Sequence, residues 1–211
     1  MSIPHAFRSA AAAAVLLLAA AAPVAAQAPA GMPGRAEVSR VSAGSYKVDP
    51  NHTQVVWSVD HFGFSTLYGM MGQITGTLQL DPARPAAAKL DIQIPLSGLT
   101  VTSEAFGKHL RSPDMFEAAK FPNARFVSTS VRPQGNRAVI TGDLTLHGVT
   151  KPVVLDAVFT GAGANPMSKV HTMGFSATAK IKRSDFGLGY AAPAVSDEAK
   201  LQITAAFEKA G

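Results

Sequence analysis

The stretch TQVVWSVDH at residues 53–61 decides the fold class of this chain. Three bulky apolar residues, Val55, Trp57 and Val59, stand at every second position, and three of the four alternate positions from 54 to 60 are polar. Side chains of a β-strand point alternately to its two faces, so this period predicts a strand with one apolar and one solvated face.

The same two-residue period recurs along most of the chain. It is found at residues 74–80, 90–94, 124–131, 138–146, 153–160, 170–181 and 201–207. Short turn-forming segments of hairpin length separate these stretches, as at 133–136 and 147–148. Half-buried strands joined by short turns build an antiparallel sheet, and closing that sheet removes its exposed edges. We predict an all-β fold of about eight strands, an extended antiparallel β-barrel or a sandwich. An eight-stranded barrel is filled by its own side chains or holds one small ligand.

The segment 101–120 departs from this period. Phe106 and Leu110 stand at helical spacing among charged residues. Ser112 precedes Pro113, and a residue before proline is disfavoured in the helical conformation. We predict a short helical insert, made of two short helices separated at Ser112–Pro113, that either caps the sheet or only connects two strands.

The N-terminal segment is expected to lie outside the folded domain. Arg8 precedes an apolar run at 10–22 that Pro23 closes, and this run is shorter than the roughly 20 residues of a membrane-spanning helix. Small residues at Val24 and Ala26 predict cleavage after Ala26. The predicted organisation is a signal peptide at 1–26, a flexible leader at 27–45 and a β-barrel domain at 46–209.

Composition argues against several functional classes. The chain has 211 residues and no Cys, so it can hold no disulfide, thiolate metal site or cysteine nucleophile. Its formal charge of +5 comes from scattered basic residues, which argues against nucleic-acid binding. Gly-x-Ser-x-Gly and phosphate-loop motifs are missing from the sequence. We expect no cofactor and no catalytic constellation.

The histidines are considered together because three of them at one site would bind a metal. Those that follow the predicted signal peptide are at least nine positions apart, so we expect no metal site. His52 and His147 are expected to stabilise turns. His61, on the face that carries Trp57, is either a polar group facing the interior or a structural histidine.

Aromatic and other large apolar residues crowd into one short segment. They are Trp57, Phe62, Phe64, Leu67, Tyr68, Met70 and Met71, interleaved with glycines. Such a segment lines a plastic apolar pocket or forms part of an ordinary hydrophobic core, and these residues alone leave both interpretations open.

Five ordered blocks of the sequence resemble those of the YceI-like family of secreted bacterial proteins. They are YKVDPNHT at 46–53, VDHFG at 59–63, HLRSPDMF with FP and FVST at 109–129, GDLTLHGVTKP at 142–152 and RSDFG at 183–187. The resemblance implies a lipocalin-like barrel in the periplasm, a carrier rather than a catalyst. Its long apolar interior would hold a polyisoprenoid chain such as a quinone or a prenyl phosphate. Met71, Glu104 and Met115 differ from the residues usual in the family. These differences affect the shape of the expected lining, and so the choice of ligand, but not the expected fold.

The resemblance and the predicted inward faces together assign the ligand-binding residues. The expected lining comprises Val55, Trp57, Val59, Phe62, Phe64, Leu67, Met70, Met71, Ile74, Leu78, Leu110, Met115, Phe116, Phe175 and Phe186. A headgroup is expected to meet His61, Tyr68, His109 or Arg111, and Arg111 would favour a phosphate.

Two other functions stay open at the level of sequence. One is an enzyme that alters a bound isoprenoid by means of His61 with Asp60 or His109. The other is a structural or stress-response barrel without a ligand, filled by its own side chains. For the carrier, the expected partners are an isoprenoid or other long-chain lipid, a membrane in transient contact and, by analogy of fold alone, a second copy in a homodimer.

Overall fold

The computed structural model describes residues 31–211, so the predicted signal peptide and the first residues of the predicted leader lie outside the described residues. The strands in this range are β1 (Gly44–Val48), β2 (Gln54–His61), β3 (Ser65–Met71), β4 (Thr75–Leu80), β5 (Lys89–Pro95), β6 (Leu99–Thr100), β7 (Asn123–Gln134), β8 (Arg137–Leu146), β9 (Val149–Ala164), β10 (His171–Lys182) and β11 (Glu198–Lys209). The helices are α1 (Glu104–Arg111) and the 3-10 helices η1 (Val38–Arg40), η2 (Pro85–Ala87), η3 (Leu96–Gly98) and η4 (Arg183–Phe186).

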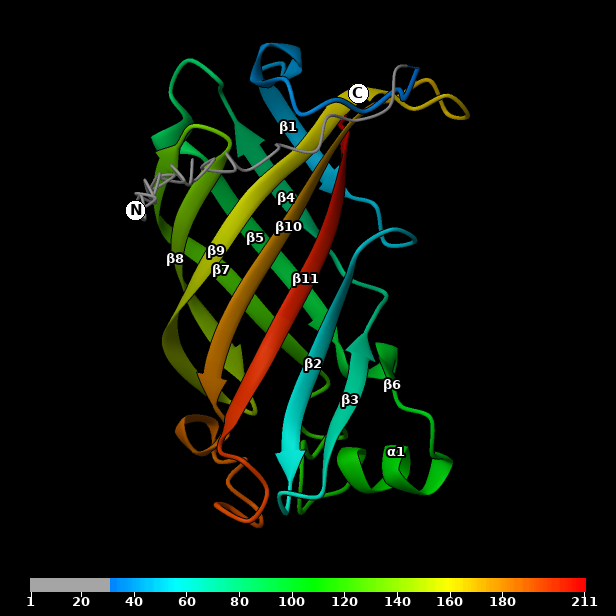
Figure 1. The fold of residues 1–211 in the computed structure, drawn as a ribbon, viewed down its shortest axis with the longest axis vertical. Helices are drawn as coiled ribbons and strands as arrows, with labels where there is room; N and C mark the ends of the chain where they lie inside the picture. Colours follow the sequence, from blue (N-terminus) through cyan, green and yellow to red (C-terminus); the bar gives the residue numbers. More distant parts are fainter. Residues whose placement is uncertain (1–30) are drawn as a thin grey trace, which may run out of the picture.

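Eight of these strands form a closed antiparallel ring in the order β1-β4-β5-β7-β8-β9-β10-β11, and β11 pairs with β1 to complete it. Figure 1 shows the ring strands tilted around an elongated interior. Closure pairs the edges that an open sheet of apolar-faced strands would expose. The predicted all-β barrel of about eight strands is confirmed.

The strands β2, β3 and β6 extend the sheet from β11 instead of joining the ring. β11 pairs with β1 over 207–209 and with β2 over 200–204, so β1 and β2 follow one another along the same side of β11. β2 then pairs with β3, and β3 with β6. The sequence pattern did not predict β1, β3 or β6. β1 and β6 are short, and in β3 apolar residues on both faces hide the alternation.

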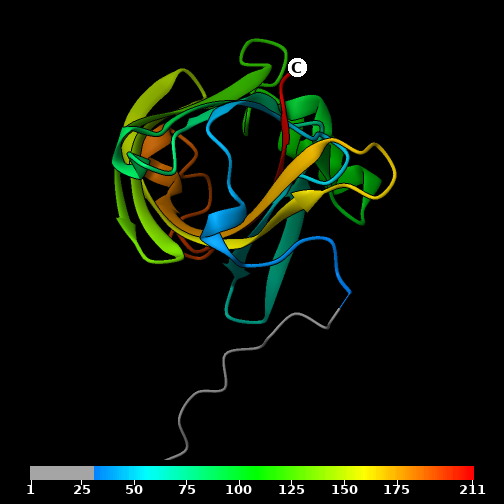
Figure 2. The same cartoon turned by 90° about the horizontal axis from the view of Figure 1, so that it is seen from above.

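The two ends of the barrel differ. The lower end in Figure 1 carries α1, the β2–β3 turn and the long β10–β11 connection. The upper end carries the β4–β5 connection, the β7–β8 turn and residues 31–43, which we call the strap. Seen from above in Figure 2, the strap, drawn in blue, passes over the rim and crosses the mouth of the barrel.

The strap takes a defined path, although the sequence assigns it to a flexible leader. Arg35 forms an antiparallel bridge with Ala162 of β9, with N···O distances of 3.2 and 3.0 Å. The Arg40 guanidinium donates to the carbonyl of Pro33 at 2.9 Å, and η1 follows the bridge. Main-chain pairing with β9 orders the strap. The amino-acid composition, from which the flexible leader was predicted, carries no information about such pairing.

The helical insert is one helix rather than two. Ser103 caps α1 by accepting a hydrogen bond at 3.3 Å from a backbone amide of the first turn, and the helix ends just before Pro113, as predicted. The predicted second helix is wrong, because residues 112–120 form turns. The amides of Phe116 and Ala118 donate back to the last turn of α1, at 3.0 and 3.2 Å. They therefore cap α1 instead of starting another helix.

Candidate functional site

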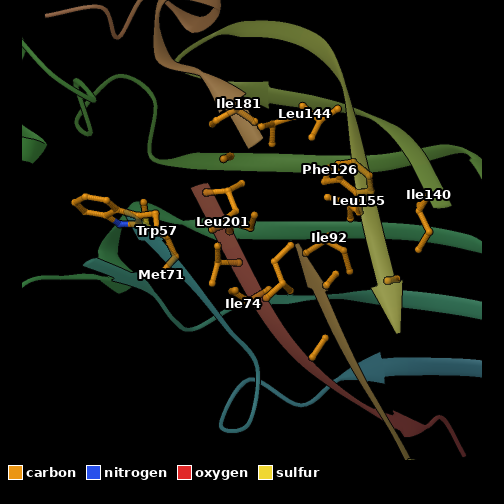
Figure 3. A pocket seen from close by; sticks show the side chains of 18 of the residues that line it. Trp57, Met71, Ile74, Ile92, Phe126, Ile140, Leu144, Leu155, Ile181 and Leu201 are labelled. Atoms are coloured by element: carbon orange, nitrogen blue, oxygen red, sulfur yellow. The ribbon is translucent and has the colours of Figure 1, made fainter. Parts of the chain in front are cut away.

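A cavity of about 720 Å³ occupies the interior of the barrel. All eight ring strands contribute to its wall, together with β2, β3 and α1. Figure 3 shows side chains from several strands, among them Ile92, Phe126, Ile140 and Leu155, projecting into the same space. The volume lies within the range of ligand-binding cavities.

Strand alternation makes the wall apolar. In β5, Leu90, Ile92 and Ile94 line the cavity. Asp91, between them, faces outward and accepts two hydrogen bonds from Arg125 of β7 at 2.8 and 2.6 Å. The hydrogen bonds from Arg125 hold the pKa of the Asp91 carboxyl below its usual value, and partial burial opposes the shift. The charged groups of this sheet region are thus paired on the outer face, away from the cavity.

A row of small side chains keeps the interior open. Ala138 of β8 is the register partner of Ala157 of β9, and Ala157 is the register partner of Ala177 of β10. All three line the cavity. The interior of an eight-stranded barrel is normally just wide enough for side chains to fill it. Three adjacent methyl groups along one row of register partners therefore leave space that larger residues would occupy.

Several polar side chains join the lining at the lower end. They are His61 at the end of β2, His109 on α1, and Arg183 and Tyr190 in the β10–β11 connection. The rings of His109 and Tyr190 pack edge to face, with 5.8 Å between their centroids. Imidazole and phenol groups donate or accept hydrogen bonds, so this end can meet a polar headgroup.

The Arg183 guanidinium organises the β10–β11 connection. It donates to the carbonyls of Leu188, Val195 and Ser196 at 2.7, 2.9 and 2.8 Å, and more weakly to that of Tyr190 at 3.3 Å. Burial lowers the pKa of Arg183, and the charge of a nearby aspartate opposes the shift. Because these carbonyls use the donors of Arg183, we assign it to holding the loop in place at the mouth.

Trp57 lines the cavity and packs tightly against β3. Its ring lies directly on Gly69 of β3, where an added Cβ would come within 2.1 Å of the indole carbon Cζ2. Among the described residues, its Nε1 is buried with no hydrogen-bond partner. Leaving a buried donor unpaired costs about 1–3 kcal/mol. Because the accessible surface of Nε1 is below 1 Å², the donor faces the packed β2–β3 contact and not the cavity.

Most residues proposed from the sequence line this cavity. They are Val55, Trp57, Val59, His61, Phe62, Leu67, Met71, Ile74, Leu78, His109, Leu110, Met115, Phe116 and Phe175. The structure brings them together from β2, β3, β4, β10, α1 and the segments beside these elements. Ligand binding by these residues stays a prediction.

Five proposed residues do not line it. Phe64, Tyr68 and Met70 are 90, 64 and 42% exposed, because they alternate with Leu67, Gly69 and Met71 along the β2–β3 hairpin and face outward. Phe186 is buried in a core cluster and not in the cavity wall.

Arg111 is the fifth, and it does not provide a free cation for a headgroup. Its guanidinium donates to the Gly107 carbonyl at 3.0 Å and to the Leu99 carbonyl. It therefore closes the C-terminal end of α1 and ties the helix to β6.

Sequence reasoning missed much of the wall. The missed residues include Leu90, Ile92, Ile94, Phe126, Ala138, Ile140, Leu144, Leu155, Ala157, Ala177, Ile181, Leu201 and Ile203. Nearly all lie on inward faces of strands that the two-residue period does predict, so strict use of that period would have found them. Tyr190 and Leu188 are in a connection and carry no comparable signal.

Of the two catalytic pairs considered from the sequence, the pair of His61 with Asp60 does not form. Asp60 and His61 are consecutive in β2 and so face opposite sides of the sheet. The Asp60 carboxylate accepts a hydrogen bond from the Gly63 amide at 2.8 Å and shapes the β2–β3 turn.

The two histidines assigned to turns are found there. His52 Nδ1 lies 2.5 Å from a carboxylate oxygen of Asp49 between β1 and β2. His147, between β8 and β9, donates through Nδ1 to the Phe186 carbonyl at 3.0 Å. Over residues 31–211, no three His, Asp or Glu side chains converge as metal ligands. Within the same range, no helix has the length and hydrophobicity to cross a membrane.

The chain is similar in sequence to known proteins. Residues 46–207 match the family model of the YceI-like domain. Protein YceI of Escherichia coli O157:H7 is 40% identical over 164 residues, which cover 77% of this chain and 85% of that protein.

Two solved structures share the fold. One is BcnA of Burkholderia cenocepacia, with a TM-score of 0.68 at 24% identity, covering 75% of this chain and 98% of the other. The second is a polyisoprenoid binding domain from Saccharophagus degradans, with a TM-score of 0.58 at 13% identity, covering 78% and 98%. At these identities the likeness concerns the fold alone.

Proposed function

The chain belongs to the YceI-like family, and from this premise we propose that it is a periplasmic carrier that holds a polyisoprenoid chain inside its barrel. The observation that carries the proposal is the cavity of about 720 Å³, whose wall consists mainly of Leu, Ile, Val, Ala and Phe side chains, with Asn136 and Arg137 where β8 begins at the upper end. A polyisoprenoid binding domain with the same fold supports this choice of ligand.

Burial of the hydrocarbon chain supplies the affinity. Each Å² of apolar surface removed from water contributes about 25 cal/mol, against the loss of freedom on binding. A branched, unsaturated chain has many methyl groups and few polar ones, so a mainly apolar wall suits it. The row of Ala138, Ala157 and Ala177 favours this function over that of a barrel filled by its own side chains.

The ligand is oriented with its polar end at the lower mouth. His61, His109 and Tyr190 line that mouth. Each of the three can hydrogen-bond an oxygen of a quinone, a prenyl alcohol or a prenyl phosphate. The hydrocarbon tail then runs upward past the alanine row.

The lipid leaves the barrel chemically unchanged in this proposal. Asp60 faces outward and caps a turn, so His61 has no carboxylate from its neighbour to act with as a base. The remaining polar groups at the mouth suit recognition of a headgroup by hydrogen bonds.

Exposed aromatic side chains beside the lower mouth suit transfer of lipid from a membrane. Phe62 and Tyr190 are 49 and 59% exposed while they line the cavity, and Phe64 is 90% exposed in the β2–β3 turn. Aromatic rings are favoured at the interface between a bilayer and water. Transient contact there would align the opening with the lipid.

Native mass spectrometry of the mature protein, purified without detergent, tests the carrier function. We expect a bound species of defined mass that solvent extraction releases as a polyisoprenoid. Bare polypeptide would call for incubation with ubiquinone and with undecaprenyl phosphate. Failure of both to bind at micromolar concentrations would refute the proposal.

A further inference from the structure

The strap contributes to the wall of the cavity at its upper end. Val38 and Val41 both line the cavity, and they lie opposite the end that carries α1. The strap runs from the outside of β9, over the rim and across the mouth to β1, as Figure 2 shows. These two valines are therefore the side chains that the far end of an elongated ligand approaches.

The outer surface of β9 is shaped to receive the strap. Ala162 is fully buried and packs in the core, so its neighbours Gly161 and Gly163 face the opposite side. A Cβ at Gly163 would lie 2.1 Å from the carbonyl oxygen of Pro33, and one at Gly161 would lie 3.1 Å from the amide nitrogen of Arg35. Two glycines thus allow the strap to lie flat on the strand.

A second anchor holds the other end of the strap. The hydroxyl of Tyr46, which is fully buried, donates to the Ser42 carbonyl at 2.6 Å. Lys209, at the end of β11, donates to the Ser42 hydroxyl at 3.0 Å. Between the two anchors no residue of η1 is buried, so the strap spans the mouth without becoming part of the core.

We infer that the strap is an end stop that limits the length of the isoprenoid tail. The inference rests on the proposed function and its orientation, with the headgroup at the lower mouth and the tail pointing up. The family match begins at residue 46, so the strap precedes the matched domain. The barrel then provides a general hydrocarbon site, and a separate segment determines which tail lengths fit.

Two substitutions test the stop in opposite directions. Gly163→Val places side-chain atoms where Pro33 lies and displaces the strap. Val38→Trp adds bulk to a side chain that is 48% exposed and lines the cavity, and so shortens the available space. Gly34→Ala is the matched control, because a Cβ there meets no atom within 4 Å.

The probe is an equimolar mixture of polyprenols from farnesol to undecaprenol, offered to the delipidated mature protein. Native mass spectrometry gives the length distribution that each variant retains. We expect Gly163→Val to shift the ratio of long to short polyprenols upward by about tenfold, and Val38→Trp to shift it downward. Burial of two further methylene groups already corresponds to about tenfold in affinity. Gly34→Ala should retain the wild-type distribution.

Hydrogen exchange supplies an independent readout of the strap. The amides of Arg35 and Ala162 should exchange faster in Gly163→Val than in the wild type, while the amides of β10 and β11 stay protected. Identical length distributions in the wild type and both variants, with the strap displaced in Gly163→Val, would overturn the end stop alone. If the wild type retained no polyprenol at all, the proposed function would fall together with it. Should Gly163→Val not fold, Val38→Trp decides by itself, since it alters a half-exposed side chain.

Discussion

The β2–β3 hairpin and the wall formed by β8, β9 and β10 enclose the same cavity by opposite means. Along one row of register partners, the wall presents Ala138, Ala157 and Ala177. Continuing through β11, the same row of register partners reaches Val55 and Met71 of the hairpin, which are large. Small side chains on one side and large ones on the other leave an off-centre space.

The hairpin has the more distinctive sequence, yet its aromatic residues are divided between two faces. Trp57 and Leu67 face the cavity, whereas Phe64 and Tyr68 face solvent. The alanines of the wall have no chemical signature. Protein interiors are close-packed, so a cavity exists where side chains are too small to meet. The comparison teaches that the residues which create a binding space need not be the ones that attract notice in a sequence.

Filling the wall should have the largest effect. Ala177→Phe places a ring in the cavity, and we expect it to weaken retention of a polyprenol by at least about a hundredfold. Its free energy of unfolding should change by only about 1 kcal/mol, since the ring enters empty space rather than a packed core. Thr178→Phe, on the outward face of β10, is the control and should bind normally. Normal retention by Ala177→Phe would mean that the ligand does not occupy the space beside Ala177.

Disturbing the packing within the hairpin should come next. Gly69→Ala puts a methyl group 2.1 Å from the Trp57 ring, which has to move. We expect a loss of about 1–3 kcal/mol in the free energy of unfolding, measured by urea denaturation. Gly189→Ala, where a Cβ has only ordinary contacts at 3.5 Å, should cost much less. Equal effects at the two glycines would contradict the close contact of Trp57 with β3.

Removing one hydrogen-bond donor from the hairpin should have a smaller effect. Trp57→Phe keeps an aromatic ring and deletes the unpaired Nε1. We expect the free energy of unfolding, measured by urea denaturation, to change by no more than about 1 kcal/mol, because removal of the unpaired donor offsets the loss of ring packing. The affinities for a polyprenol and for squalene, a hydrocarbon without oxygen, should change in parallel, because a ligand in the cavity does not reach Nε1. A selective fall in polyprenol affinity would mean that Nε1 contacts the headgroup.

The smallest effect concerns the outward face of the hairpin. Phe64→Ser should leave affinity in solution unchanged and slow the transfer of lipid from phospholipid vesicles by about threefold, because one exposed ring is lost from the proposed membrane contact. Met167→Ser is the control, since Met167 is 89% exposed at the upper end of the barrel. Equal slowing in the two variants would place the membrane contact elsewhere.

The fold was largely predictable from the sequence, and the site only in part. Strands such as β5, with Leu90 and Ile92 inward and Asp91 outward, obey a period that any half-buried strand must follow. β3 was missed because Met70 on its outer face is as apolar as Met71 on its inner face. The prediction of a second helix in the insert was wrong. The backbone amides that could have begun that helix donate to the last turn of α1 instead.

The sequence by itself determined the all-β class, most strands and the apolar inner face, because these depend on local periodicity and on which side chains avoid water. Only the tertiary structure decided that Arg111 caps a helix, that three alanines are partners on neighbouring strands, and that the strap crosses the upper mouth. Each of these depends on register or on contacts between distant segments. Strand register and ring closure determine these contacts. No local stretch of sequence specifies the register or the closure.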